Sequence, residues 1–398
     1  MNKREFLFFS TFSLAMVGAI VEPFNLFSNF NVGDVLFIFV CITLLPIHSY
    51  RVNYLTILPI VILLFSVLSI FVNLIIGNDY EYNFGTPFRL LYYIFIIIII
   101  SNFIDTDEKE HYLWWSVLVG LSLTCLLVYF EWMKTPIYLG SIPMFHTVHN
   151  FDSFPINRNY LGFFSAIAIA ISVGLISVEK YKVRKIILVF ITVAISLMSI
   201  FTFSKGTWLA SFLGVIIYYL LYKKNKKNKI ILLIFFVIVV MIFSAVYQEY
   251  LNEILEQVQR RISSSDSTNH ERVEYIYLSF DVVNLNPIFG VGTGAFESAL
   301  KSINAQYLTK DPHNALLWIF SENGLISLAS FLVMLSYIFW SCLFSKSKFR
   351  DLYFLLLLSL VFTMPTQGTS YTMKYLWVLF GICISMKRIR RREYGKFN

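Results

Sequence analysis

The stretch YLTILPIVILLFSVLSIFVNLII, residues 54–76, carries no charged side chain and is long enough to cross a membrane's hydrocarbon core, which is roughly 30 Å thick. Similar apolar runs recur from one end of the chain to the other. Of 398 residues, 57% are hydrophobic and 14% are charged, whereas a soluble domain has about 25% charged residues. The composition therefore predicts an all-α, polytopic integral membrane protein, a single membrane domain of residues 1–398.

Basic residues gather in short clusters beside the apolar runs, and the positive-inside rule places these clusters in the cytoplasm. With both termini inside, the chain then threads into about twelve transmembrane helices. Residues 387–398 form a basic cytoplasmic tail. The helices are expected near 6–21, 33–48, 54–76, 87–104, 112–132, 159–178, 186–203, 207–222, 230–247, 323–344, 351–364 and 375–386.

The net charge of +8 comes from these clusters, so it indicates topology and does not point to a nucleic-acid partner. The four cysteines lie inside apolar runs without paired or metal-type spacing, which predicts small core residues. No His, Cys and carboxylate cluster has the spacing of a metal site. We therefore expect neither a metal nor a cofactor.

The longest outer loop, residues 248–312, is the expected place for function. Apolar residues recur at helical spacing between Leu251 and Ile262 and again between Val273 and Phe280. They predict two short amphipathic helices that lie along the membrane surface.

The loop ends in DPHNALLWIFSENG, residues 311–324, where a histidine opens an apolar helix. Asp311 and Pro312 suit the N-cap and the first helical position, so His313 is expected in a first turn whose free N–H groups attract anions. A membrane chain seldom places such polar groups without a function. The plainer alternative is that His313 and Asn314 only solvate a helix end.

Glu322 lies nine residues after this histidine, so on a straight helix the two side chains would point in opposite directions. Either the helix breaks near Asn323 and Gly324, or Glu322 has a separate structural role.

Three glycines stand close together in NPIFGVGTGAF, residues 286–296. Gly290, Gly292 and Gly294 do not have the GxGxxG spacing of a dinucleotide site, and their expected location is outside the cytoplasm. They predict a tight turn that re-enters the membrane surface.

Four cations lie on the predicted outer side, where the positive-inside rule expects few. Arg89 is near the outer end of the fourth span, Arg158 begins the sixth, Lys205 sits in a very short turn and Arg272 begins the second loop helix. Each alone fits a side chain that reaches up to lipid headgroups. Together they predict an anionic ligand at this face.

In order and spacing, four of these segments resemble the core of the bacterial O-antigen ligase and O-antigen polymerase superfamily. They are SKGTW at 204–208, Arg272, NPIFGVGTGAF and PHNALLWIFSENG. NRNYLG, residues 157–162, is similar to an asparagine-containing signature of the same family.

The resemblance implies a metal-independent, inverting glycosyltransferase. It would act on glycans carried by undecaprenyl diphosphate, on the periplasmic or exterior side of the bacterial inner membrane.

By position, His313 matches the family's essential histidine and would be the general base. Arg272 matches the arginine that engages the diphosphate, with Arg89 as a further cation. Lys205 stands where arginine is usual, and lysine cannot grip phosphate bidentately, which favours the more divergent polymerases. Supporting roles are expected for Glu322, Asn314, Arg158, Asn159, Gly290 and Gly292.

We therefore predict a polymerase that joins lipid-linked repeat units into O-antigen or capsule-like polysaccharide. Its expected partners are the lipid bilayer, a flippase and a chain-length regulator. A ligase that transfers the finished chain to lipid A core is the nearest alternative. A transporter or flippase of lipid-linked sugars is the alternative from another class. The predicted spans, however, show almost no ionisable groups at mid-depth for a proton or ion relay.

Overall fold

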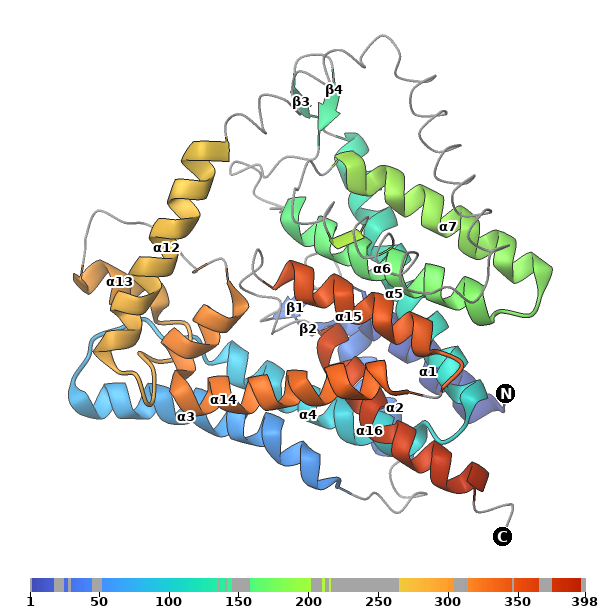
Figure 1. The fold of residues 1–398 in the computed structure, drawn as a ribbon, viewed down its shortest axis with the longest axis horizontal. Helices are drawn as coiled ribbons and strands as arrows, with labels where there is room; N and C mark the ends of the chain where they lie inside the picture. Colours follow the sequence, from blue (N-terminus) through green and yellow to red (C-terminus); the bar gives the residue numbers. More distant parts are fainter. Residues whose placement is uncertain are drawn as a thin grey trace. The chain divides into compact units, whose positions relative to one another are not determined.

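The chain divides into two compact units in a computed structural model (Figure 1). The first unit comprises residues 1–120, 274–350 and 360–398, and the second comprises 121–273 and 351–359. The residues that the structure describes are 2–17, 25–27, 30–44, 52–134, 137–139, 142–144, 158–201, 210–211, 215, 265–303, 312, 314–345, 347–364 and 374–394.

Helices make up most of the described chain. The first unit contains α1 (Lys3–Ala15), α2 (Val32–Leu44), α3 (Ile57–Ile76), α4 (Gly85–Phe103), α13 (Phe296–Ile303), α14 (Ala315–Leu343) and α16 (Lys374–Tyr394). The second contains α6 (Arg158–Val178) and α7 (Lys182–Phe201). Parts of both units are formed by α5 (Asp107–Lys134), α12 (Ser265–Leu285) and α15 (Arg350–Thr363). Two short antiparallel hairpins add β1 (Asn25–Phe27) with β2 (Phe30–Asn31), and β3 (Ile137–Leu139) with β4 (Ile142–Met144).

Five described helices are long and apolar enough to cross a membrane. They are Tyr54–Ile76, Gly85–Phe103, Asp107–Val128, Leu161–Val178 and Ala315–Leu343. The first has the predicted bounds of 54–76, and the last begins eight residues before its predicted start. The predicted spans at 207–222 and 230–247 lie almost wholly outside the described residues, so the twelve-span topology stays a prediction.

In the predicted long loop, α12 occupies the place of the second amphipathic helix, and α13 is a helix that the sequence did not indicate. The first amphipathic helix, between Leu251 and Ile262, falls outside the described residues. The cysteines Cys41, Cys125, Cys342 and Cys383 are all buried, as predicted.

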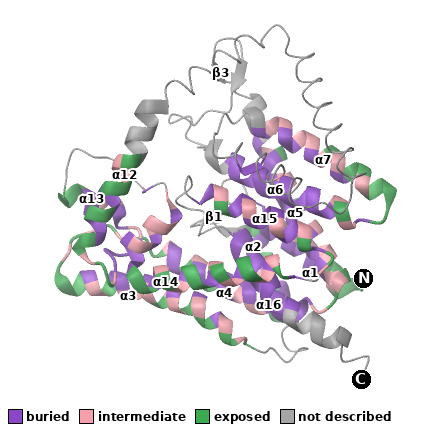
Figure 2. Cartoon of the chain, in the orientation of Figure 1, coloured by how far each residue is buried: buried purple, intermediate pink, exposed green. Residues whose placement is uncertain are grey.

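Helix pairs build the core of the first unit, with α3 against α14, α4 against α16 and α1 against α2. Figure 2 shows that α4 is largely buried, whereas α3 and α14 expose much of their length. The exposed side chains on α3 and α14 are mostly large and apolar, which is typical of a surface that faces lipid.

Three polar segments meet at one end of the first unit. Lys109 Nζ lies 3.0 Å from Asp105 and 4.0 Å from Glu5 at the start of α1, and Lys348 Nζ lies 3.2 Å from Asp107. The N-terminus, the acidic loop 105–111 and the basic segment 346–350 therefore share an end. This is the arrangement expected if all three lie on one side of a membrane.

A buried ion pair joins four helices of the same unit. Lys374, the first residue of α16, donates to the two carboxylate oxygens of Asp34 on α2 at 2.7 and 2.8 Å, and to the carbonyl of Ala15 at the end of α1. The hydroxyl of Tyr92 on α4 also donates to Asp34, at 2.7 Å. The ammonium group thus has three acceptors and satisfies a carbonyl at a helix C-terminus. This pair was not predicted from the sequence. Its role is structural, because it links four helices.

Removing one partner of this pair should destabilise the protein strongly, because the other charge would stay buried without compensation. We expect Asp34→Asn and Lys374→Met each to lower the free energy of unfolding by about 3–5 kcal/mol, and the double variant to recover part of that loss. Lys301→Met, which removes the exposed Lys301–Glu297 pair, is the matched control and should leave the free energy of unfolding nearly unchanged, because solvent screens an exposed pair. Thermal unfolding in detergent measures all four; equal losses in the single and double variants would contradict the pairing.

Candidate functional site

Helix α14 is broken at Gly324, the last residue of the segment that carries the predicted site. Gly324 has φ 77° and ψ −178°, which no helical residue adopts, so a first piece of residues 315–323 is separated from the longer remainder. Of the two alternatives for Glu322, the break is therefore confirmed. Glu322 itself is 2% exposed and lies at the end of the first piece.

The first piece of α14 begins later than predicted. Its N-cap is Asn314, whose side chain accepts from the amides of Leu316 and Leu317 at 3.0 and 3.2 Å. The prediction that Asp311 caps the helix and Pro312 opens it is wrong, because Asn314 satisfies the free amides instead. The amide of Ala315 donates to the carbonyl of Met364 at 3.1 Å, which anchors the start of the helix.

A helix break exposes unpaired main-chain groups, and residues 286–295, the glycine turn, satisfy them. The amides of Val291 and Gly292 donate to the carbonyls of Ser321 and Glu322 at 2.8 and 3.0 Å, which pairs the end of the first piece. The amide of Leu325, which begins the second piece, donates to the carbonyl of Pro287 at 3.0 Å. One turn thus caps the helix on both sides of its break.

Two glycines let the main chains come this close. Gly290 has φ 80°, and a Cβ on it would collide with the carbonyl of Glu322. A Cβ on Gly324 would collide with the carbonyl of Ile288. The sequence prediction of a tight turn at the glycines is confirmed, and its partner is the break in α14.

Buried polar side chains of α3 fasten the turn. Asn73 donates from Nδ2 to the carbonyl of Gly290 at 2.8 Å, and Thr293 Oγ1 lies 2.7 Å from both the carbonyl of Ser66 and Oδ1 of Asn323. All four side chains are at most 1% exposed. These four side chains, the polar seam, are those of Ser66, Asn73, Thr293 and Asn323. They hold the glycine turn against α3 and against the break in α14.

The polar seam was not predicted from the sequence. A usable signal was present, because Asn73, Ser66 and Ser69 are polar residues within the otherwise apolar run 54–76. Polar groups in a span need partners, and that requirement points to a contact with another polar segment.

The segment that precedes Arg89 is hydrogen-bonded to the glycine turn. The amide of Asn83 donates to the carbonyl of Thr293 at 2.8 Å, and Asn83 Oδ1 accepts from the amide of Gly85, the first residue of α4. Arg89 follows one turn later and makes only long bonds, 3.5 Å to the carbonyl of Gly85 and 3.3 Å to Thr86 Oγ1. No carboxylate in the described part of the chain is within ion-pair distance of it. Its charge is therefore available to an anion.

The structure thus brings Gly290 and Gly292 against Glu322, and Arg89 and Asn314 lie elsewhere in the same first unit. Arg272 is placed on α12 and Arg158 and Asn159 at the start of α6, by their helices only. His313 and Lys205 lie outside the described residues, although Pro312 and Asn314 on either side of the histidine are described.

Replacing Gly290 tests the fit between turn and break, with Gly77 as the matched control. Gly77 also has a positive φ, 87°, but nothing lies within 4 Å of a Cβ placed on it. Gly77→Ala should cost about 1–2 kcal/mol of stability from backbone strain alone. Gly290→Ala should cost roughly 1–3 kcal/mol more, because the main chain of the glycine turn must also move away from that of α14 at Glu322. Equal shifts in the unfolding temperature would argue against a close fit.

Comparison with known proteins adds one match. Residues 188–332 match a protein family described as O-antigen ligase. The matched range includes the glycine turn, α12, α13, Arg272 and the break in α14. No curated protein matches the chain. Residues 188–332 of this multi-pass membrane protein are therefore similar to the O-antigen ligase family, which supports the superfamily of O-antigen ligases and polymerases.

Proposed function

We propose that the protein is a membrane glycosyltransferase that polymerises glycan repeat units carried by undecaprenyl diphosphate. The observation that carries this proposal is the family match over a region where a rigid frame flanks His313. That frame is the first piece of α14, which is hydrogen-bonded to Met364 at its start and to the glycine turn at its end. Such a frame restricts where residue 313 can go, and catalytic groups need this restriction.

In the proposed reaction, an acceptor sugar hydroxyl attacks the anomeric carbon of the donor glycan. His313 removes the hydroxyl proton as the new C–O bond forms. The bond between the anomeric carbon and the diphosphate oxygen breaks, and its electron pair leaves with the lipid diphosphate. Attack from the opposite side inverts the anomeric centre.

The leaving diphosphate gains negative charge, so fixed cations near it stabilise the transition state. Arg89 supports this role, because it has no acidic partner among the described residues and follows Asn83, whose amide donates to the glycine turn, by six residues. Arg272 and Lys205 are the other proposed cations. Lys374 is excluded from this group, since Asp34 neutralises it.

A ligase that transfers the finished chain to lipid A core is the second candidate, and the description of the matched family favours it. Lys205, in place of the arginine that the resemblance leads us to expect, favours the polymerase. Either enzyme would use the same lipid-linked donor and the same histidine.

Replacing His313 should abolish glycan transfer. We expect His313→Ala to produce no polymer while the protein still inserts into the membrane, because the acceptor hydroxyl keeps its proton. His111→Ala is the matched control, since His111 stacks on Phe349 at the opposite end of the first unit and should leave transfer unchanged. The measurement is elongation of a lipid-linked repeat by the purified protein; polymer of normal amount from His313→Ala would refute the catalytic role.

The glycans of a strain that lacks the protein distinguish the candidates. Loss of a polymerase leaves a single repeat unit on the core, whereas loss of a ligase leaves bare core and accumulated lipid-linked chains. If the purified protein moves lipid-linked sugars across vesicles but never elongates them, the transporter alternative is favoured.

Replacing Arg89 should slow transfer without preventing folding. We expect Arg89→Ala to reduce the transfer rate about 10- to 100-fold, the loss that corresponds to one charge-assisted hydrogen bond of roughly 1.5–3 kcal/mol. Arg184→Ala is the control, because Arg184 contacts the ring of Tyr181 at the start of α7. A rate within twofold of wild type in Arg89→Ala, by the same elongation assay, would remove Arg89 from the site.

A further inference from the structure

Helix α12 has two apolar faces, and the described residues cover one of them. Leu278 and Val282 are 8% and 0% exposed and pack in a cluster with Val291 of the glycine turn and with Phe296 and Leu300 of α13. This face fastens the helix to the first unit.

The opposite face carries Val273, Ile276, Tyr277 and Phe280, the outer stripe. These side chains recur at the spacing of one helical face and are 49%, 39%, 68% and 46% exposed. The sequence predicted an apolar stripe at these positions, but in the structure the helix packs through its other side. Four large apolar side chains on one face require a nonpolar partner.

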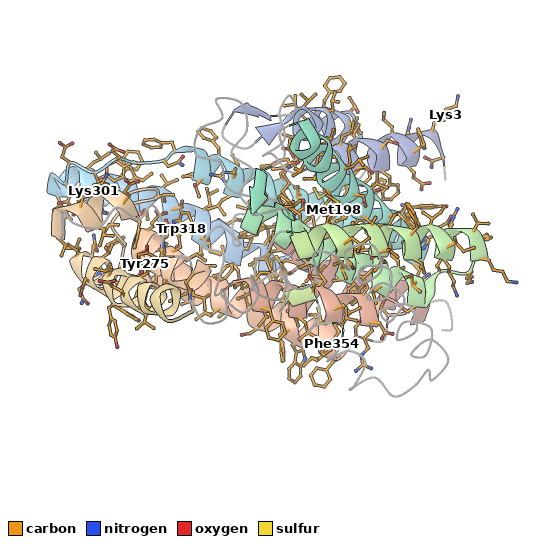
Figure 3. The ribbon with its side chains drawn as sticks, turned by 90° about the horizontal axis from the view of Figure 1, so that it is seen from above. Lys3, Met198, Tyr275, Lys301, Trp318 and Phe354 are labelled. Atoms are coloured by element: carbon orange, nitrogen blue, oxygen red, sulfur yellow. The ribbon has the colours of Figure 1, made fainter. Side chains whose placement is uncertain are left out.

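The direction of α12 indicates which partner this is. The part of α12 in the first unit runs across α3 and α14 in Figure 1, and near Tyr275 it is seen close to end-on in Figure 3, where α14 still runs along the page. Since α3 and α14 are long and apolar enough to span a membrane, a helix that crosses them lies along the membrane plane.

The contacts just after α12 hold it close to a membrane-spanning helix. Phe289 stacks on Phe65 of α3 with ring centroids 5.9 Å apart, and Asn73 of α3 binds the carbonyl of Gly290. Two further apolar side chains after the stripe, Leu285 and Ile288, are also exposed, by 47% and 53%.

We propose that the outer stripe docks into the outer leaflet of the bilayer, with acyl chains as its partner. Tyr277 suits this position, because tyrosine rings favour the boundary between acyl chains and headgroups. Arg272 directly precedes the stripe, so docking holds its main chain at the level of the lipid phosphates. A lipid-linked diphosphate lies at that level, and this consequence rests on the proposed function.

Docking is measured with an environment-sensitive fluorophore on single introduced cysteines, in vesicles with or without lipids that carry a quencher high on the acyl chain. The four native cysteines are buried and do not compete for the label. Labels at Ile276→Cys and Phe280→Cys should lose fluorescence about twofold or more, because an interfacial helix sits about 5–10 Å into the headgroup and acyl boundary. The label at Ser302→Cys, on exposed Ser302 of α13, should respond to aqueous iodide instead.

Two results would overturn the docking. Labels at 276 and 280 that respond to iodide as strongly as the label at 302 would place the stripe in water. Labels shielded from both quenchers would mean that protein covers the stripe, as in contact with a second copy.

The consequence for the substrate is tested separately in the same vesicles. Phe280→Asp should lower glycan transfer about tenfold by pulling α12 from the leaflet, and Phe280→Leu should not, since it keeps the apolar contact. If Phe280→Asp transfers glycan at the wild-type rate, docking of α12 does not help to bind the lipid diphosphate. Quenched labels in a wild-type protein that transfers no glycan would refute the proposed function and leave the docking surface intact.

Discussion

The hydrogen bonds from Val291 and Gly292 to Ser321 and Glu322 are the interaction on which the rest of this structure depends. A broken helix in an apolar environment leaves amides and carbonyls without partners, and water is not there to replace them. The glycine turn supplies partners on both sides of the break, but only because Gly290 and Gly324 let two main chains touch. Once the break is satisfied, the first piece of α14 becomes a short, fixed element that begins two residues after His313 in the chain.

The cations of the first unit differ in what they can do. Lys374 is held by Asp34, Tyr92 and a helix-end carbonyl, so its charge is used within the fold. Arg89 is held only by long bonds within its own helix turn. Sequence position would not separate the two, since both stand near the start of an apolar helix. Their partners do: Lys374 is paired with Asp34 and stabilises the fold, whereas no described carboxylate pairs with Arg89.

Much of the fold followed from hydrophobic pattern and charge, and several helix bounds agree to within a few residues. The start of α14 did not, because the sequence pointed to Asp311 as the N-cap and only the folded chain shows that Asn314 accepts the free amides. The seam of Asn73, Ser66, Thr293 and Asn323 was not predicted either. Asn73 and Ser66 lie more than two hundred residues from the groups that they bind, and a single sequence carries no information about which polar groups will meet.

The sequence by itself determined that the chain is a multi-pass membrane protein, and it located the histidine, the glycine string and the cations that resemble a glycan-transferring family. Those conclusions rest on composition and local spacing, which are known without any tertiary contact. Tertiary structure alone decided that the helix breaks at Gly324, that the glycine turn caps the break, and that α12 packs through one apolar face and leaves the other uncovered. Such choices depend on which buried groups find partners across the chain, and that is settled only when the segments pack together.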